Sequence, residues 1–109
     1  MSIVANNPFL PQTFSAAALN QVDQDFRQWL HHRGFWSEDV ERLFLYLTHN
    51  QHIPAPITSQ QKELLEQMIV DALDGVNITE RYPAFFHDLL HNVLLRREFI
   101  NMVSRAPQP

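Results

Sequence analysis

The closing stretch of the chain, from Arg81 to Val103, carries two apolar stripes that do not fit on one straight helix. Residues advance by about 100° around a helix, so side chains three and four positions apart share a face. The first stripe consists of Phe85, Phe86, Leu89 and Leu90, and the second of Leu95, Phe99, Met102 and Val103. On a single straight helix the second stripe would be rotated from the first by about a third of a turn. Asn92 lies between them, and an asparagine side chain can accept a backbone N–H at the start of a helix. The stretch therefore predicts two short helices that meet near His91 and Asn92.

Start and stop signals also predict two helices in the first half of the chain. Ser15 fits the N-cap of a helix that runs to His32, and Gly34 is placed to end it. Ser37 fits the start of the next helix, which carries acidic residues in its first turn and frays near Asn50.

A third upstream helix follows the proline-containing connection at residues 51–57. Thr58 and Gln61 have the spacing of a capping box, and Asp74-Gly75 is a C-terminal signal. We expect a turn over residues 76–79, after which Pro83 suits the first turn of another helix.

The predicted fold is all-α: a small bundle or orthogonal array of about five helices in a single domain. No run of residues alternates between apolar and polar as a strand would, and the two glycines are too few to supply hairpin turns. The length of 109 residues suits one core. We divide the chain into an extended N-terminal arm at 1–13, a helical domain at 14–104 and a flexible tail at 105–109.

The composition of the chain indicates which partners and which cellular compartment to expect. The net charge is −4 with only eight Lys and Arg residues, which disfavours nucleic acid and anionic lipid surfaces as partners. No stretch approaches the roughly 20 apolar residues that cross a bilayer, and the N-terminus lacks a secretory signal. The chain contains no cysteine, which is compatible with a reducing compartment. These features predict a cytoplasmic protein that does not contact the membrane.

His87 and His91 are candidate metal ligands, because imidazoles at i and i+4 can reach one ion on a helix face. Asp88 follows the first histidine where zinc metalloproteases place a glutamate, so hydrolytic zinc chemistry is not predicted. Solvated surface is the favoured interpretation of the pair, and a histidine-dependent metal-binding protein is kept as an alternative. We predict no cofactor and no enzymatic activity, since no catalytic triad or phosphate loop is present.

DNA binding by a helix-turn-helix is a second alternative. The segment from Trp29 to Leu47 contains two predicted helices joined by a tight turn. Its second helix begins with acidic residues, and only Arg42 is available there to contact a guanine.

The chain has more large apolar side chains than narrow helix stripes require. Some could cover the core from loops, and others could form a surface for a partner. We therefore predict a noncatalytic helical protein-interaction module, an adaptor or regulatory subunit that binds another protein or a second copy of itself. The candidate interaction residues are Phe9, Leu10, Phe35, Trp36, Tyr46, Leu95, Phe99 and Met102.

Overall fold

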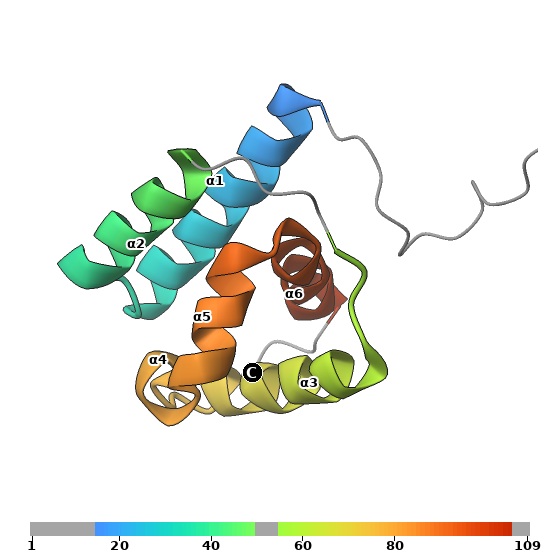
Figure 1. The fold of residues 1–109 in the computed structure, drawn as a ribbon. Helices are drawn as coiled ribbons and strands as arrows, with labels where there is room; N and C mark the ends of the chain where they lie inside the picture. The colour runs from blue at the N-terminus through green and yellow to red at the C-terminus, as the bar shows by residue number, and fades with distance from the viewer. Residues whose placement is uncertain (1–14, 50–54, 106–109) are drawn as a thin grey trace, which may run out of the picture.

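The computed structural model describes residues 15–49 and 55–105, and in these ranges the chain forms six helices and no strand (Figure 1). The helices are α1 (Ala16–Arg33), α2 (Glu38–His49), α3 (Ser59–Leu73), α4 (Ile78–Arg81), α5 (Pro83–His91) and α6 (Val93–Arg105). The all-α class and the small helical array are confirmed. Positions 1–14 and 106–109, which hold nearly all of the predicted arm and tail, lie outside the described residues, and Arg105 is the last residue of α6.

The predicted caps of the first two helices are confirmed by hydrogen bonds. The Ser15 hydroxyl accepts the backbone N–H of Ala18 at 3.1 Å and begins α1. Gly34 ends α1 as predicted, with a φ of 77° in the left-handed region that favours glycine. The last helical residue is Arg33, one position beyond the predicted His32. The Ser37 hydroxyl accepts the N–H of Val40 at 3.3 Å at the start of α2.

The second half of the chain also begins with a predicted cap. The Thr58 hydroxyl accepts the N–H of Gln61, and the Gln61 side chain accepts the N–H of Thr58, which completes the capping box of α3. Residues Ile78–Arg81 form the one-turn helix α4, although a turn is predicted there. The Asn77 side chain accepts the N–H of Thr79 at 3.1 Å, and the Ile78 side chain is fully buried. A single turn has no repeating stripe, so its sequence pattern resembles that of a loop.

The predicted break in the closing stretch is present. Helix α5 ends at His91 and α6 begins at Val93. Between them Asn92 is extended, and its side-chain oxygen accepts the backbone N–H of Leu94 at 2.9 Å. The break gives the two apolar stripes different helix axes, so that each stripe can face the core.

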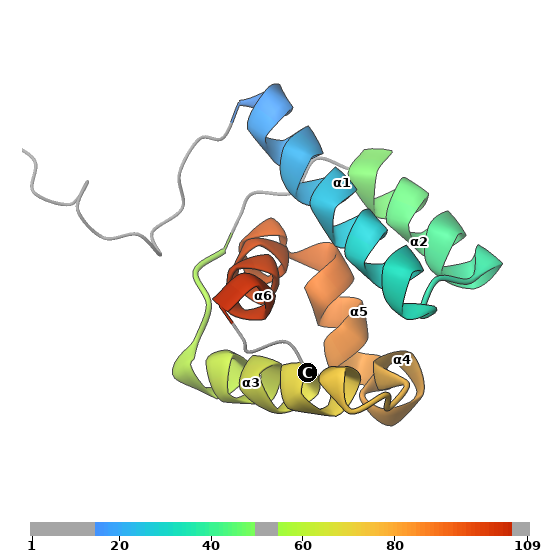
Figure 2. The same ribbon diagram turned by 180° about the vertical axis from the view of Figure 1, so that it is seen from behind.

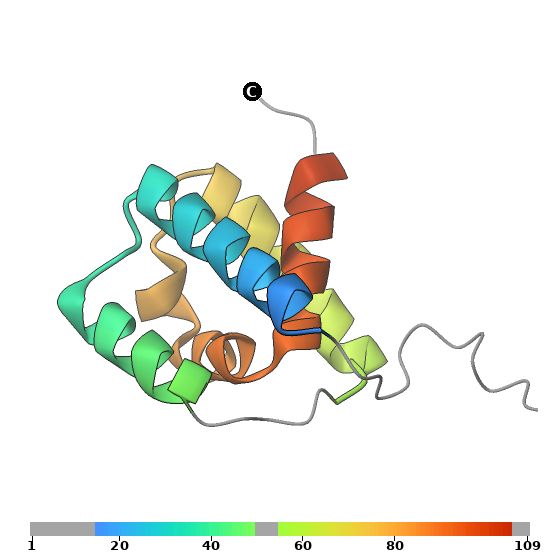
Figure 3. The same cartoon turned by 90° about the horizontal axis from the view of Figure 1, so that it is seen from above.

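Helix α6 is the central element, because it packs against α1, α3 and α5. Helices α1 and α2 lie side by side and run antiparallel, as Figures 1 and 3 show. Helices α5 and α6 lie between this hairpin and α3 (Figure 2). The short helix α4 joins α3 to α5 and packs against both.

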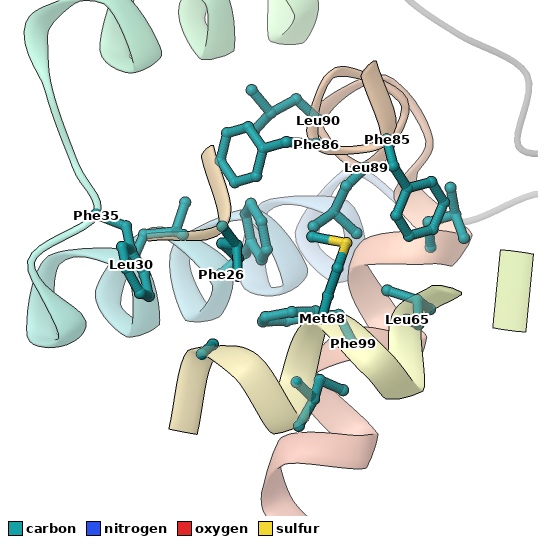
Figure 4. Packing of buried hydrophobic residues seen from close by; sticks show 14 of the residues in the cluster. Phe26, Leu30, Phe35, Leu65, Met68, Phe85, Phe86, Leu89, Leu90 and Phe99 are labelled. Carbon is teal, nitrogen blue, oxygen red and sulfur yellow. The ribbon is translucent and has the colours of Figure 1, made fainter. Parts of the chain in front are cut away.

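The core is formed where the helices meet around the aromatic ring of Phe99. This ring makes edge-to-face contacts with Phe26 at 5.5 Å and with Trp29 at 4.8 Å between ring centroids. Figure 4 shows Met68 from α3 reaching the same region, with Leu89 beside it. The fully buried large side chains come from every helix: Phe26, Leu30, Phe44, Leu65, Met68, Ile78, Leu89, Leu90, Leu95 and Phe99.

Candidate functional site

Three of the predicted interaction residues belong to the core. Leu95 and Phe99 have no exposed surface, and Phe35 is 8% exposed. Leu95 and Phe99 are buried because α6 packs against α1, α3 and α5. Phe35 follows the end of α1, and its ring packs 6.0 Å from that of Trp29. Apolar periodicity indicates a buried face without saying whether the burial lies within one chain or between chains.

Trp36 and Met102 are half-buried and pack against the core. The Trp36 ring lies 5.8 Å from that of Phe44 and stacks on His31 at 4.8 Å between centroids. Trp36 therefore closes the turn between α1 and α2. Phe9 and Leu10 lie outside the described residues.

Tyr46 is the predicted interaction residue with the clearest exposure, at 66% of its surface. Leu45 beside it is 43% exposed. Both follow Arg42 by three or four positions, so the three side chains share one face of α2. Arg42 also pairs with Asp39 one turn earlier, at 3.3 Å. We define these four residues, Asp39, Arg42, Leu45 and Tyr46, as the α2 outer face.

The opposite face of α2 fixes the orientation of this surface. Phe44 and Leu47 are buried, and the Phe44 ring lies 6.4 Å from that of Phe26 in α1. The Arg27 guanidinium covers the Phe44 ring at 4.7 Å and lies 3.7 Å from the Glu41 carboxylate. Because one side of α2 is anchored in the core, its outer face is directed away from α1.

A second apolar surface lies in an open groove of about 420 Å³ between α3 and α6. Val70, which is 53% exposed, and Met102 supply much of its apolar lining together with Ile69. Lys62, Glu66 and Arg105 supply charge of both signs along the groove. Sequence reasoning missed Val70, because it occupies the polar side of a helix whose apolar stripe is satisfied elsewhere.

A cluster of titratable side chains joins α3 to the start of α5. The Tyr82 hydroxyl donates a hydrogen bond to the Asp71 carboxylate, which also accepts from the Gln67 amide at 3.1 Å and pairs with Arg81 at 3.6 Å. The bond from Tyr82 lowers the pKa of Asp71 from its ordinary value against the opposing effect of burial. The same bond raises the pKa of Tyr82 above its ordinary value. The cluster fastens two helices together.

Arg96 is a buried charge that connects three helices. Its guanidinium pairs with Asp23 of α1 at 2.8 Å. One nitrogen donates to the carbonyl oxygens of Leu89, at 3.3 Å, and of Leu90 at the end of α5. Burial lowers the pKa of Arg96, and the charge of Asp23 opposes that shift. Arg96 thus supplies donors to carbonyls left without helical partners by the break at Asn92.

His87 and His91 lie on one exposed side of α5, with their rings stacked 6.1 Å apart between centroids. Across residues 15–49 and 55–105, no group of three or more His, Cys, Asp or Glu side chains is arranged to hold a metal ion. His87 and His91 are thus two neighbouring imidazoles without a third such side chain placed to complete a metal site in these residues.

The α1–α2 segment is the one considered for a helix-turn-helix. Helices α1 and α2 form an antiparallel hairpin (Figures 1 and 3). Arg42, the candidate for contact with a guanine, pairs with Asp39.

Comparisons with protein-family models, with curated proteins and with solved structures found no match. None of the helices in the described part of the chain has the length and apolar character needed to cross a membrane.

Proposed function

We propose that this protein is a noncatalytic helical interaction module, acting in the cytoplasm as an adaptor or regulatory subunit, that self-associates through the α2 outer face. The observation that carries the proposal is the exposure of Leu45 and Tyr46 beside Arg42, on a helix whose other side is anchored in the core. The absence of cysteine from the sequence is compatible with the reducing conditions of the cytoplasm.

The composition of the α2 outer face is typical of an interface centre. Tyrosine and arginine are enriched among residues that dominate binding energy, because they bury much apolar area and keep a polar group for orientation. Single exposed apolar residues are ordinary on protein surfaces. Here two of the three large exposed apolar side chains among the described residues are adjacent, Leu45 and Tyr46.

The polar chemistry of the described residues supports a noncatalytic role. Asp71 and Arg96 are the buried ionisable side chains in this part of the chain. Asp71 fastens Tyr82 to α3, and Arg96 holds α1, α5 and α6 together. Each carries out a structural task that explains its perturbed pKa.

A second copy of the chain is the occupant that this surface fits best. Two α2 helices could pack antiparallel about a twofold axis that crosses them at the level of residue 44. Positions 42 and 46 are equally far from that level, so Arg42 of each copy would lie opposite Tyr46 of the other. The guanidinium could then lie over the tyrosine ring in a cation–π contact, while the leucines pack beside it. One surface would thus satisfy both copies, as an isologous contact requires.

The size of the surface sets the expected affinity. The 12 residues of α2 extend over about 18 Å, at 1.5 Å per residue. One face of such a helix is smaller than the roughly 800 Å² per partner of a standard interface. We therefore expect a weak dimer, with a dissociation constant in the micromolar range or above.

Sedimentation equilibrium of the full chain from about 1 to 500 μM tests the proposal. The weight-average mass should rise toward that of a dimer, and the double variant Leu45→Lys/Tyr46→Lys should remain monomeric while keeping its helical circular dichroism. Val70→Lys is a matched control, because it replaces an exposed apolar side chain on α3. Wild-type protein that stays monomeric throughout would overturn self-association, and a dimer lost only in the Val70 variant would overturn the assignment to α2.

A further inference from the structure

We propose that α5 carries a metal-binding site in which the His87 and His91 imidazoles together chelate one divalent first-row transition ion, of the class of Zn²⁺ or Ni²⁺. The site is separate from the α2 outer face, and its argument does not depend on self-association. It rests on the position of the two rings on α5.

The backbone places the two rings next to each other on one face of α5. His87 and His91 are four residues apart on a helix, so both lie on the same row of the α5 surface. Both residues are exposed, and their ring planes are within 14° of parallel. An ion can therefore approach the pair from solvent without opening the core.

The distance between the rings is close to that of a chelate. A Zn–N bond of about 2.0–2.1 Å, plus a ring radius of about 1 Å, puts each ring centre about 3 Å from the ion. Two rings on a tetrahedral ion would thus have centres about 5 Å apart. The observed separation is 6.1 Å. The two rings are stacked in this structure, and rotation about χ2, whose energy wells are broad for histidine, would turn one nitrogen of each ring toward a common ion.

The chemistry of the ligands selects the ion. Imidazole nitrogen suits zinc, copper and nickel, whereas magnesium and calcium prefer oxygen ligands. Two protein ligands leave at least two positions of a tetrahedral ion open to water or to a donor from another molecule. Such a site binds an ion and retains the capacity to accept a further ligand.

Isothermal titration of Ni²⁺ and Zn²⁺ into full-length protein, prepared without a histidine tag and cleared of metal, tests the site. We expect one ion per chain with a saturable binding curve. His87→Ala and His91→Ala should each weaken binding by roughly tenfold or more, because the second imidazole of a chelate binds at a high effective concentration. The loss in the double variant should be much smaller than the sum of the two single losses, since either change alone destroys the chelate.

The matched controls are His31→Ala and His32→Ala at the end of α1. These residues are adjacent in sequence, so they do not share a helix face, and both are exposed. Each control should leave the high-affinity step unchanged. Loss of binding in the controls, independent small losses in His87→Ala and His91→Ala, or no saturable uptake by the wild type would overturn the proposal.

Discussion

Replacing Arg96 with methionine should destabilise the protein far more than an ordinary arginine substitution. Methionine keeps much of the length and apolar stem of arginine but removes the charge that pairs with Asp23 and the donors that reach the carbonyls of Leu89 and Leu90. Removing one partner of a buried ion pair costs about 3–5 kcal/mol, because the other charge is left without compensation. Asp23 keeps 17% of its side-chain surface exposed, so water offsets part of the loss. We expect a decrease of about 3 kcal/mol in the free energy of unfolding.

Urea unfolding followed by circular dichroism measures this loss. Arg105→Met on the same helix is the control, since its ion pair with Glu98 is 3.5 Å long and 69% exposed on the arginine side. The control should change stability by no more than about 0.5 kcal/mol. In the double variant Asp23→Ala/Arg96→Met the two losses should not add, because the unpaired carboxylate is also gone. A loss below about 1 kcal/mol in Arg96→Met, or strict additivity, would refute the structural role assigned to Arg96.

Three further predictions concern the core, the break and the joint between α3 and α5. Phe99→Ala should cost about 3–5 kcal/mol in chemical denaturation, since the ring is fully buried; a loss under about 1 kcal/mol would contradict its place in the core. Asn92→Ala should cost about 1 kcal/mol by the same assay, because it removes the cap of α6. The pKa of Asp71 is lower in the folded protein than its ordinary value of about 4. The ionised carboxylate therefore stabilises the fold fully above about pH 4, and this stabilisation is lost as the pH falls through the lower pKa of the folded state. The stability difference between wild type and Asp71→Asn should therefore shrink between about pH 5 and pH 2, and a constant difference would contradict the shift.

The helix boundaries that the sequence predicts well are those controlled by local hydrogen bonds. Ser15, the capping box at Thr58 and Gln61, and Asn92 each bond to a backbone group within three residues. Gly34 is predictable for a related reason, because the left-handed backbone that ends α1 favours glycine regardless of the surrounding fold.

The features that sequence reasoning missed depend on which helices become neighbours. Arg96 and Asp23 are 73 positions apart, and no local pattern connects them. Leu95 and Phe99 form an apolar stripe that would look the same in a core or in an interface, and the central position of α6 decides between the two. Tyr46 is predicted as an interaction residue alongside side chains that turn out to be buried, and only the burial of Phe44 and Leu47 on the other side of α2 distinguishes it from them.

The proposed contact between two copies of α2 is tested most directly by cysteine cross-linking. The natural chain has no cysteine, so Leu45→Cys introduces a single thiol on the α2 outer face while keeping Tyr46 and Arg42. Val70→Cys places a thiol of comparable exposure on α3, since Val70 is 53% exposed and Leu45 is 43% exposed. Treated with a short bis-maleimide at about 100 μM protein, the Leu45 variant should form a covalent dimer and the Val70 variant should remain a monomer. Equal cross-linking of both variants, or of neither, would contradict self-association through α2.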